Sequence, residues 1–223
     1  MIRVETGSGP AGPPPAPQLP AEALSRAAAL MAAGGRRLLG LAGPPGAGKS
    51  TLAALLAAAL GPAACVVPMD GFHLAQRELE RLGRAGRKGA PDTFDAAGYR
   101  ALLQRLRAAG GEEPVYAPEF RREIEEPVAG AIAVGPEVRL VITEGNYLLL
   151  DEGPWAGVAA LLDETWYVHT PDVLRVPRLV ARHVAHGRAE AEARRWVEAS
   201  DEPNARRVAG TRARAAYVFR WSG

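Results

Sequence analysis

The fold of this chain is decided by the stretch Gly43-Pro44-Pro45-Gly46-Ala47-Gly48-Lys49-Ser50-Thr51. Its first eight residues match the phosphate-binding pattern G-x-x-x-x-G-K-S/T at every fixed position. The apolar residues 38–42 before it are typical of a buried strand, and residues 52–60 after it have the composition of a helix that Gly61-Pro62 ends. The motif therefore lies in the strand, loop and helix context that it requires.

The chemistry of this phosphate loop follows from its residue types. Glycines let the backbone wrap around a phosphate chain, so that successive N–H groups and the start of the helix face negative charge. Lys49 would then reach the β- and γ-phosphates of ATP, and Ser50 would hold Mg²⁺. The alternative is a turn that merely joins a strand to a helix. The residues expected to bind the nucleotide here are Gly43, Gly46, Ala47, Gly48, Lys49, Ser50 and Thr51.

Size and composition narrow the class of protein. A chain of 223 residues can bury a full core, and a single α/β domain is expected. The formal net charge of +2 argues for neither nucleic acid nor a membrane surface as a partner. The single cysteine excludes an internal disulfide, and no secretory signal or membrane span is evident. We expect a cytoplasmic protein, and a homodimer stays open.

The order of segments predicts how the domain is built. Residues 1–18 are rich in Pro and Gly and are expected to be disordered, whereas residues 19–223 form the domain. The long connection at about residues 74–137 is expected to be an insertion on the substrate side. Helices are predicted at residues 20–33 and 95–109 and loops at 116–122 and 200–204, with strands at 64–69, 138–143, 165–169 and 216–219. Pro68 indicates that the second strand lies at the sheet edge.

Two acidic residues follow apolar runs that are predicted to be strands. Because ligands bind beyond the carboxyl ends of parallel strands, Asp70 and Glu144 should face the same crevice as the phosphate loop. Asp70 could accept a hydroxyl proton or help to hold Mg²⁺, and Glu144 suits metal or substrate binding. The alternatives are a turn aspartate before Gly71 and a capping or surface glutamate.

A row of arginines lies on the helix predicted at about residues 171–186. Pro177 should kink this helix or mark its true start. Arg175, Arg178 and Arg182 are spaced three and four apart, so on an unbroken helix they would share one face. That row could close over a nucleotide and neutralise the charge of the moving phosphoryl group, or it could be a solvated basic face.

Three further residues are candidates for substrate contact. His73 follows Asp70, and Tyr116 and Arg122 belong to the loop expected at residues 116–122. A basic loop at residues 84–91 lies in the same insertion. Structural or solvent-exposed roles are equally open for all of these residues.

Six motifs occur in one order along the chain: Gly43 to Thr51, Met69-Asp70-Gly71-Phe72-His73, Ala90-Pro91-Asp92-Thr93-Phe94-Asp95, Glu125-Glu126-Pro127-Val128, Ile142-Thr143-Glu144-Gly145-Asn146-Tyr147 and Arg178-Leu179-Val180-Ala181-Arg182-His183. With this ordered set the chain resembles the phosphoribulokinase and uridine kinase family of P-loop kinases. The resemblance implies a three-layer α/β sandwich whose five-stranded parallel sheet has the order 2-3-1-4-5. It also implies a helical lid at about residues 172–190.

The resemblance also implies an activity. It predicts an ATP-dependent, Mg²⁺-using kinase that phosphorylates a hydroxyl of a nucleoside, a pantothenate-like compound or a sugar. Asp70 would be the base, and Arg178, Arg182 and Arg188 the lid arginines. Arg121 stands where relatives often have Asp, which puts the identity of the substrate in doubt. The alternative function is a nucleotide-sensing or ATPase module that has no small-molecule acceptor.

The first prediction concerns Lys49. We expect Lys49→Ala to abolish phosphoryl transfer and to leave the fold intact, because a lysine in a solvent-accessible loop contributes charge rather than packing. ATP turnover measures the first effect, and circular dichroism with thermal unfolding measures the second. Near-normal turnover in the variant would remove the basis of this interpretation.

Overall fold

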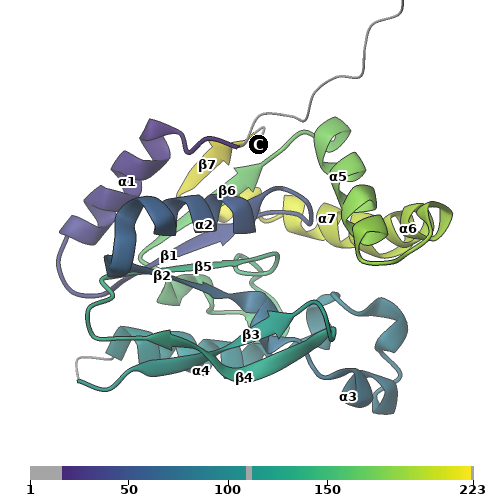
Figure 1. Cartoon of the computed structure of the whole chain (residues 1–223), viewed down its shortest axis with the longest axis horizontal. Coiled ribbons are helices and arrows are strands. Elements are labelled where there is room, and N and C mark those ends of the chain that lie inside the picture. The colour runs from purple at the N-terminus through teal and green to yellow at the C-terminus, as the bar shows by residue number, and fades with distance from the viewer. Residues whose placement is uncertain (1–16, 109–111, 222–223) are drawn as a thin grey trace, which may run out of the picture.

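The computed structural model describes residues 17–108 and 112–221 (Figure 1). Residues 1–16 of the segment expected to be disordered lie outside the described residues. In the described ranges the centre of the molecule is a five-stranded parallel sheet. Its strands, in spatial order, are β2 (Ala64–Pro68), β5 (Leu140–Gly145), β1 (Arg37–Ala42), β6 (Glu164–His169) and β7 (Tyr217–Arg220).

The strand order confirms the expected topology. Counted along the chain, the parallel strands occur in the order 2-3-1-4-5, and β2, which ends at Pro68, lies at the edge. Strand β1 is central, and its Leu39 pairs with Ile142 of β5 and with Glu164 of β6. Strand β5 begins and ends two residues later than predicted. Because it ends at Gly145, Glu144 lies inside the strand rather than beyond its end.

Helices cover both faces of this sheet and make the three layers (Figure 1). On one face, α1 (Ala21–Ala32) and α2 (Lys49–Leu60) pack in a core that includes Leu56 and Trp166. On the other face, α4 (Ala96–Ala108) packs in a core that includes Tyr99, Tyr147 and Trp155. The described chain also contains α3 (Gln76–Arg81) and 3₁₀ turns at Gly61–Ala63, Met69–Phe72, Ala85–Arg87, Pro91–Thr93, Gly153–Trp155, Ala159–Leu161 and Arg212–Arg214.

The loop predicted at residues 116–122 is wrong, because this segment is a strand. Strand β3 (Val115–Arg121) pairs with the antiparallel strand β4 (Glu126–Val134) in a separate two-stranded sheet. The strand pattern is weak in the sequence because Pro118 interrupts it, and the register shifts at that point. The hairpin packs on the turn Met69–Phe72, since a Cβ on Gly71 would lie 2.3 Å from the backbone oxygen of Pro118.

The C-terminal helices also differ from the predictions. Helix α5 (Asp172–Ala185) continues through Pro177. Proline has no backbone N–H, so the carbonyl of Val173 loses its hydrogen bond within the helix. Because Val173 is 80 % exposed, water can donate to that carbonyl instead. Helix α6 (Glu190–Trp196), the π-helix Val197–Asp201 and α7 (Glu202–Ala209) follow. The loop predicted at residues 200–204 is therefore wrong, because Pro203 lies in the first turn of α7, where a helix tolerates proline.

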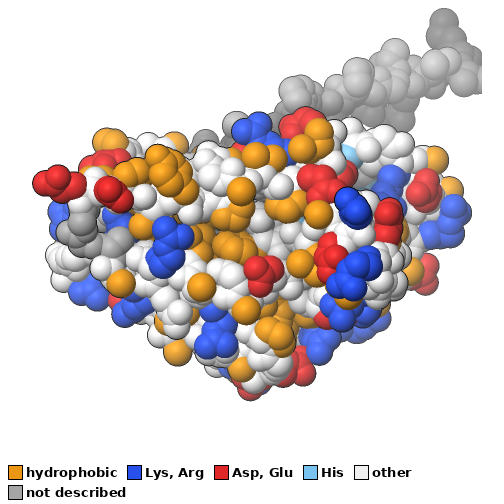
Figure 2. Space-filling model, turned by 90° about the horizontal axis from the view of Figure 1, so that it is seen from below, with side chains coloured by type: hydrophobic (Ala, Val, Ile, Leu, Met, Phe, Trp, Pro, Cys, Tyr) orange, Lys and Arg blue, Asp and Glu red, His pale blue; other side chains and the backbone are white. Residues whose placement is uncertain are grey.

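The surface carries both signs of charge. Figure 2 shows the face seen from below, where acidic and basic side chains are interspersed with apolar ones. This mixture agrees with the small formal net charge of +2. Within the residues that the structure describes, no helix combines the length and the apolar character needed to cross a membrane.

A buried pair of hydroxyl groups joins three of these elements. The Thr143 hydroxyl on β5 donates to the backbone oxygen of Val67 on β2 at 2.7 Å. Its one hydrogen is thereby used, so the Tyr99 hydroxyl on α4, which lies 2.6 Å away, donates to Thr143. All three residues are fully buried. The Thr143 hydroxyl therefore accepts one hydrogen bond and donates another at a site that water does not reach.

The second prediction compares two variants of this pair. Thr143→Val keeps the side-chain shape but leaves the Tyr99 hydroxyl without its acceptor, and we expect it to cost about 2 kcal/mol of unfolding free energy. Tyr99→Phe leaves the bond from Thr143 to Val67 in place and should cost about 1 kcal/mol. Urea unfolding of both variants measures the difference. An equal or smaller effect of Thr143→Val would contradict this account.

Candidate active site

The phosphate loop has a backbone that requires glycine. Gly46 and Gly48 have φ values of 77° and 86°, which side chains rarely adopt. A Cβ on Gly48 would also lie 2.6 Å from Nε1 of Trp221, and a Cβ on Gly43 would lie 2.6 Å from the backbone oxygen of Val168. The loop is therefore held against β6 and the end of the described chain. Helix α2 begins at Lys49, which confirms the predicted context.

Lys49 is buried, contrary to the expectation of a solvent-accessible loop. It is the first residue of α2 and is 7 % exposed. Its Nζ donates to the backbone oxygen of Pro44 at 3.0 Å and to Oδ1 of Asn146 at 2.8 Å. Burial lowers the pKa of Lys49 to about 8, against the opposing effect of the Glu144 and Asp70 carboxylates. The ammonium group is thus poorly solvated and able to gain from a phosphate.

Asn146 is a functional candidate that sequence reasoning missed. It follows β5 directly and lies within the quoted motif Ile142-Thr143-Glu144-Gly145-Asn146-Tyr147, but no role was expected for it. Its amide oxygen orients the Lys49 ammonium group across 97 residues of sequence. The motif position was the available signal, whereas the partner was visible only in three dimensions.

The two expected carboxylates share one cavity with the phosphate loop. Asp70 lies in the 3₁₀ turn after β2, and its side chain is about one third exposed. Glu144 is buried and accepts a hydrogen bond from the Ser50 hydroxyl at 2.9 Å. Burial, together with the neighbouring Asp70, raises the pKa of Glu144, while Lys49 and Ser50 act in the opposite direction. A cation between these oxygens would relieve the buried negative charge.

The donor set fits Mg²⁺. Ser50, Glu144 and Asp70 offer only hard oxygen ligands, which Mg²⁺ prefers. Among the described residues, no group of three or more His, Cys, Asp or Glu side chains could hold a metal ion.

The expected row of three arginines divides into two roles. Arg178 and Arg182 line the cavity, but Arg175 is 1 % exposed and does not. Its guanidinium donates to Glu202 at 2.6 Å and to the backbone oxygen of Pro45 at 3.2 Å. Arg175 therefore fastens α5 and α7 to the phosphate loop. The idea that it closes over a nucleotide is wrong.

Arg188, expected at the nucleotide, also lines the cavity. Its guanidinium lies 4.1 Å from the centre of the Trp196 ring and 3.7 Å from a carboxylate oxygen of Glu192.

Arg182 lies on α5. Burial lowers its pKa, and the positive charge of Arg122 lowers it further. Cations from α5 and from the hairpin side therefore converge on the same space.

Two of the three substrate candidates line the cavity. His73 is packed between Phe94 and Phe120, with ring centres at 4.0 Å and 4.7 Å, and its Nδ1 donates to the backbone oxygen of Asp70. Nη2 of Arg122 lies 3.6 Å from Oδ2 of Asp70. Tyr116 is 55 % exposed on β3 and lies outside the cavity lining.

The replacement at Arg121 does not reach the cavity. Nε of Arg121 lies 2.7 Å from a carboxylate oxygen of Glu119, and both side chains are exposed on the hairpin. Arg121 is not among the lining residues. The departure from the family pattern thus changes the hairpin surface rather than the cavity.

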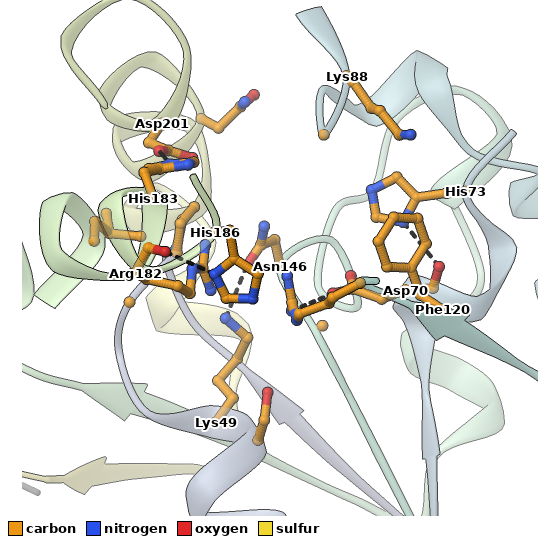
Figure 3. A pocket seen from close by; sticks show the side chains of 18 of the residues that line it. Lys49, Asp70, His73, Lys88, Phe120, Asn146, Arg182, His183, His186 and Asp201 are labelled. Atoms are coloured by element: carbon orange, nitrogen blue, oxygen red, sulfur yellow. Dashed lines mark hydrogen bonds and ion pairs between the residues drawn. The ribbon is translucent and has the colours of Figure 1, made fainter. Parts of the chain in front are cut away.

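The cavity has a volume of about 1010 Å³ and two chemically different sides (Figure 3). Arg182, His183 and Asp201 lie on the side of the C-terminal helices, where His183 and Asp201 are 2.8 Å apart. The opposite side carries Asp70 and His73, which follow β2, and Phe120 and Lys88, which belong to the insertion. Lys88, Phe120 and the pair of His183 and Asp201 were not singled out from the sequence as site residues.

Comparison with known proteins identifies the family. No family model matches the chain. It is 37% identical over 180 residues to a Schizosaccharomyces pombe protein provisionally named a uridine kinase, covering 77% of this chain and 76% of that protein. It is 35% identical over 178 residues to the uncharacterised Escherichia coli protein YggC, covering 78% and 73%.

Solved structures agree. A Silicibacter sp. TM1040 protein, provisionally described as a fructose transport system kinase, has a TM-score of 0.77 and 39% identity over 88% of this chain and 98% of its own. Saccharomyces cerevisiae YFH7, provisionally described as a P-loop kinase with a circular permutation, has a TM-score of 0.76 over 90% and 99% of the two chains. Its identity of 17% supports the fold alone. The chain therefore belongs to the uridine kinase family of P-loop kinases.

Proposed function

We propose that the protein transfers the γ-phosphoryl group of ATP to a hydroxyl group of a small metabolite. The observation that carries the proposal is that one cavity is lined by both the phosphate loop and Asp70. Its volume of about 1010 Å³ lies at the upper end of the range for sites that hold one small molecule, so a nucleotide and an acceptor can share it.

The phosphate loop and Lys49 account for nucleotide binding. Backbone N–H groups of the loop and of the first turn of α2 surround the β- and γ-phosphates, and the Lys49 ammonium group exchanges its bonds to Pro44 and Asn146 for phosphate oxygens. Ser50 and Glu144 are the residues that would hold Mg²⁺. When bound, Mg²⁺ neutralises charge that develops on the phosphate oxygens.

Asp70 is the general base in this proposal. Its carboxylate takes the proton of the acceptor hydroxyl while that oxygen forms a bond to the γ-phosphorus. The bond from the γ-phosphorus to the bridging oxygen breaks, and ADP leaves. Glu144 is less suited to this role, because it is buried and occupied by the Ser50 hydroxyl. Asp70 is partly exposed and can meet an acceptor.

The arginines of the C-terminal helices form the lid side of the site. Arg178 and Arg182 project into the cavity from α5, whose base Arg175 fixes to the phosphate loop. A guanidinium at this place stabilises the charge of the phosphoryl group as it moves between oxygens. Arg188 extends the same positive lining toward the nucleotide.

One experiment separates this proposal from a nucleotide-sensing or ATPase module. ADP formation is measured with purified protein, ATP and Mg²⁺, with and without nucleosides, pantothenate and sugars. Phosphoryl transfer predicts that ADP forms in step with a phosphorylated acceptor. ADP formation that no acceptor accelerates would favour an ATPase, and binding of ATP without any turnover would favour a sensor.

The third prediction concerns Asp70. Asp70→Asn keeps the shape of the side chain but cannot take a proton, so turnover should fall by about 10² to 10⁴ while ATP binding persists. The loose transition state of phosphoryl transfer favours the lower end of that range. Recovery at high Mg²⁺ would indicate that Asp70 acts on the metal ion instead. Full activity at ordinary Mg²⁺ would exclude both roles and favour Glu144 as the base.

The fourth prediction concerns Arg182. We expect Arg182→Ala to lower kcat by about tenfold or more and to change ATP affinity much less, because a closing guanidinium meets developing charge mainly in the transition state. Arg194→Ala is the matched control, since Arg194 is exposed on α6 and pairs with Glu190 at 2.7 Å. Equal losses of kcat and ATP affinity would make Arg182 a ground-state anchor.

A further inference from the structure

Lysine is rare in this chain, and its two occurrences meet in one place. The sequence has 27 Lys and Arg residues, of which only Lys49 and Lys88 are lysines. Both line the cavity. Lys49 belongs to the phosphate loop, whereas Lys88 comes from the insertion and lies on the opposite side, beside His73 and Phe120 (Figure 3). Lys88 therefore adds a positive charge at the side that faces the acceptor.

The cationic side chains of the loop that carries Lys88 have different partners. Arg84 and Arg87 share the Asp92 carboxylate, at 3.4 Å and 2.7 Å, so one negative charge offsets part of their positive charge. Nζ of Lys88 instead donates to the backbone oxygen of Glu125 at 2.6 Å. In the part of the chain that the structure describes, Lys88 forms no ion pair with a carboxylate, although Glu125 also lines the cavity. An ammonium group has three donors, so further donors remain for a ligand.

The Lys88 ammonium group lies beside an aromatic ring and is not paired with any carboxylate of the described residues. Its Nζ lies 5.4 Å from the centre of the Phe120 ring, which packs on His73. Burial lowers the pKa of His73, and Lys88 and Arg122 act in the same direction, whereas Asp70 opposes it. The imidazole therefore favours its neutral form, and a ligand meets an apolar wall with one ammonium group at its end.

Four acidic residues line the cavity: Asp70, Glu125, Glu144 and Asp201. Glu144 is buried beside Ser50, and Asp70 is paired with Arg122. An anionic ligand group would be repelled by these carboxylates and attracted by Lys88. An anion held by Lys88 would leave the other end of the ligand to reach Asp70, which lies on the same side of the cavity (Figure 3).

We propose that the acceptor carries an anionic group, a carboxylate or a phosphate, and that Lys88 binds this group while the hydroxyl lies at Asp70. This inference rests on the proposed kinase function and narrows its substrate class. Neutral nucleosides and neutral sugars would leave the ammonium group of Lys88 with only the Glu125 carbonyl as a partner. Arg122 is shared between Asp70 and the space near Arg182, so Lys88 is the residue that distinguishes the two classes.

The test compares acceptors that carry an anionic group with related neutral compounds. ADP formation is measured with glycerate, glycerol phosphate and glycerol, with pantothenate and pantothenol, and with uridine monophosphate and uridine. The proteins are the unaltered chain, Lys88→Gln, Lys88→Arg and Arg87→Gln. Arg87 is the matched control, because it lies in the same loop and pairs with Asp92 outside the cavity lining. Thermal unfolding of each variant shows whether the bond to Glu125 is only a structural link.

We expect an anionic member to exceed its neutral counterpart in kcat/KM by about tenfold or more. Lys88→Gln should remove most of that difference through the KM of the acceptor, with the KM of ATP nearly unchanged. Lys88→Arg should keep the preference, and Arg87→Gln should match the unaltered chain. The glycerate and glycerol phosphate arms separate a carboxylate from a phosphate site.

Two results would overturn the inference. One is a neutral compound whose kcat/KM equals that of its anionic counterpart. The other is an equal change in kcat/KM for both compounds of a pair in Lys88→Gln. If no compound supports ADP formation, the proposed function fails. The anion site is then tested separately, by calorimetric measurement of the binding of the same compounds in the presence of a non-hydrolysable ATP analogue. Absence of binding by every anionic compound at millimolar concentration would then exclude it.

Discussion

The parallel register of three neighbouring strands is the constraint on which the site depends. Strand β1 pairs with β5 up to Ala42 and Gly145, and β2 pairs with β5 up to Pro68 and Glu144. Because the strands run in the same direction, the phosphate loop, the turn with Asp70 and the residues after β5 all leave the sheet at one edge. Groups that are far apart in the sequence thus reach one cavity without any of them being built on a long flexible segment.

The site holds its charges in an environment that does not fully satisfy them. Burial disfavours the charged forms of both Lys49 and Glu144, lowering the pKa of one and raising that of the other. Phosphate oxygens and a divalent cation would supply the missing partners. Across the cavity, Arg175 uses its buried guanidinium to tie the C-terminal helices to the phosphate loop, so Arg178 and Arg182 are presented from a fixed base.

The insertion supplies part of the cavity lining opposite the C-terminal helices. The β3–β4 hairpin packs on the turn that carries Asp70 and brings Phe120 and Arg122 into the lining. Tyr147 donates its hydroxyl to the backbone oxygen of Gly89, which holds the loop that carries Lys88 against the domain. The phosphate loop and the side of the cavity that carries Lys88 are therefore supported by different parts of the chain.

Local backbone chemistry could be predicted from the sequence, because it is encoded by adjacent residues. The phosphate loop, the buried strand before it, the edge position of β2 and the acidic residues at strand ends all follow from patterns within a few positions. The β3 strand escaped prediction since Pro118 interrupts its pattern and its stability comes from pairing with β4.

The choice of side-chain partners was decided only by the tertiary structure. Lys49 meets Asn146 across 97 residues, and Arg175 meets Pro45 across 130, so no local pattern distinguishes these contacts from others. The spacing of Arg175, Arg178 and Arg182 correctly places them on one helix. It does not indicate which of the three becomes buried when the helix packs against the phosphate loop. Sequence spacing fixes the direction of a side chain relative to its own element, whereas the partner depends on where the other elements pack.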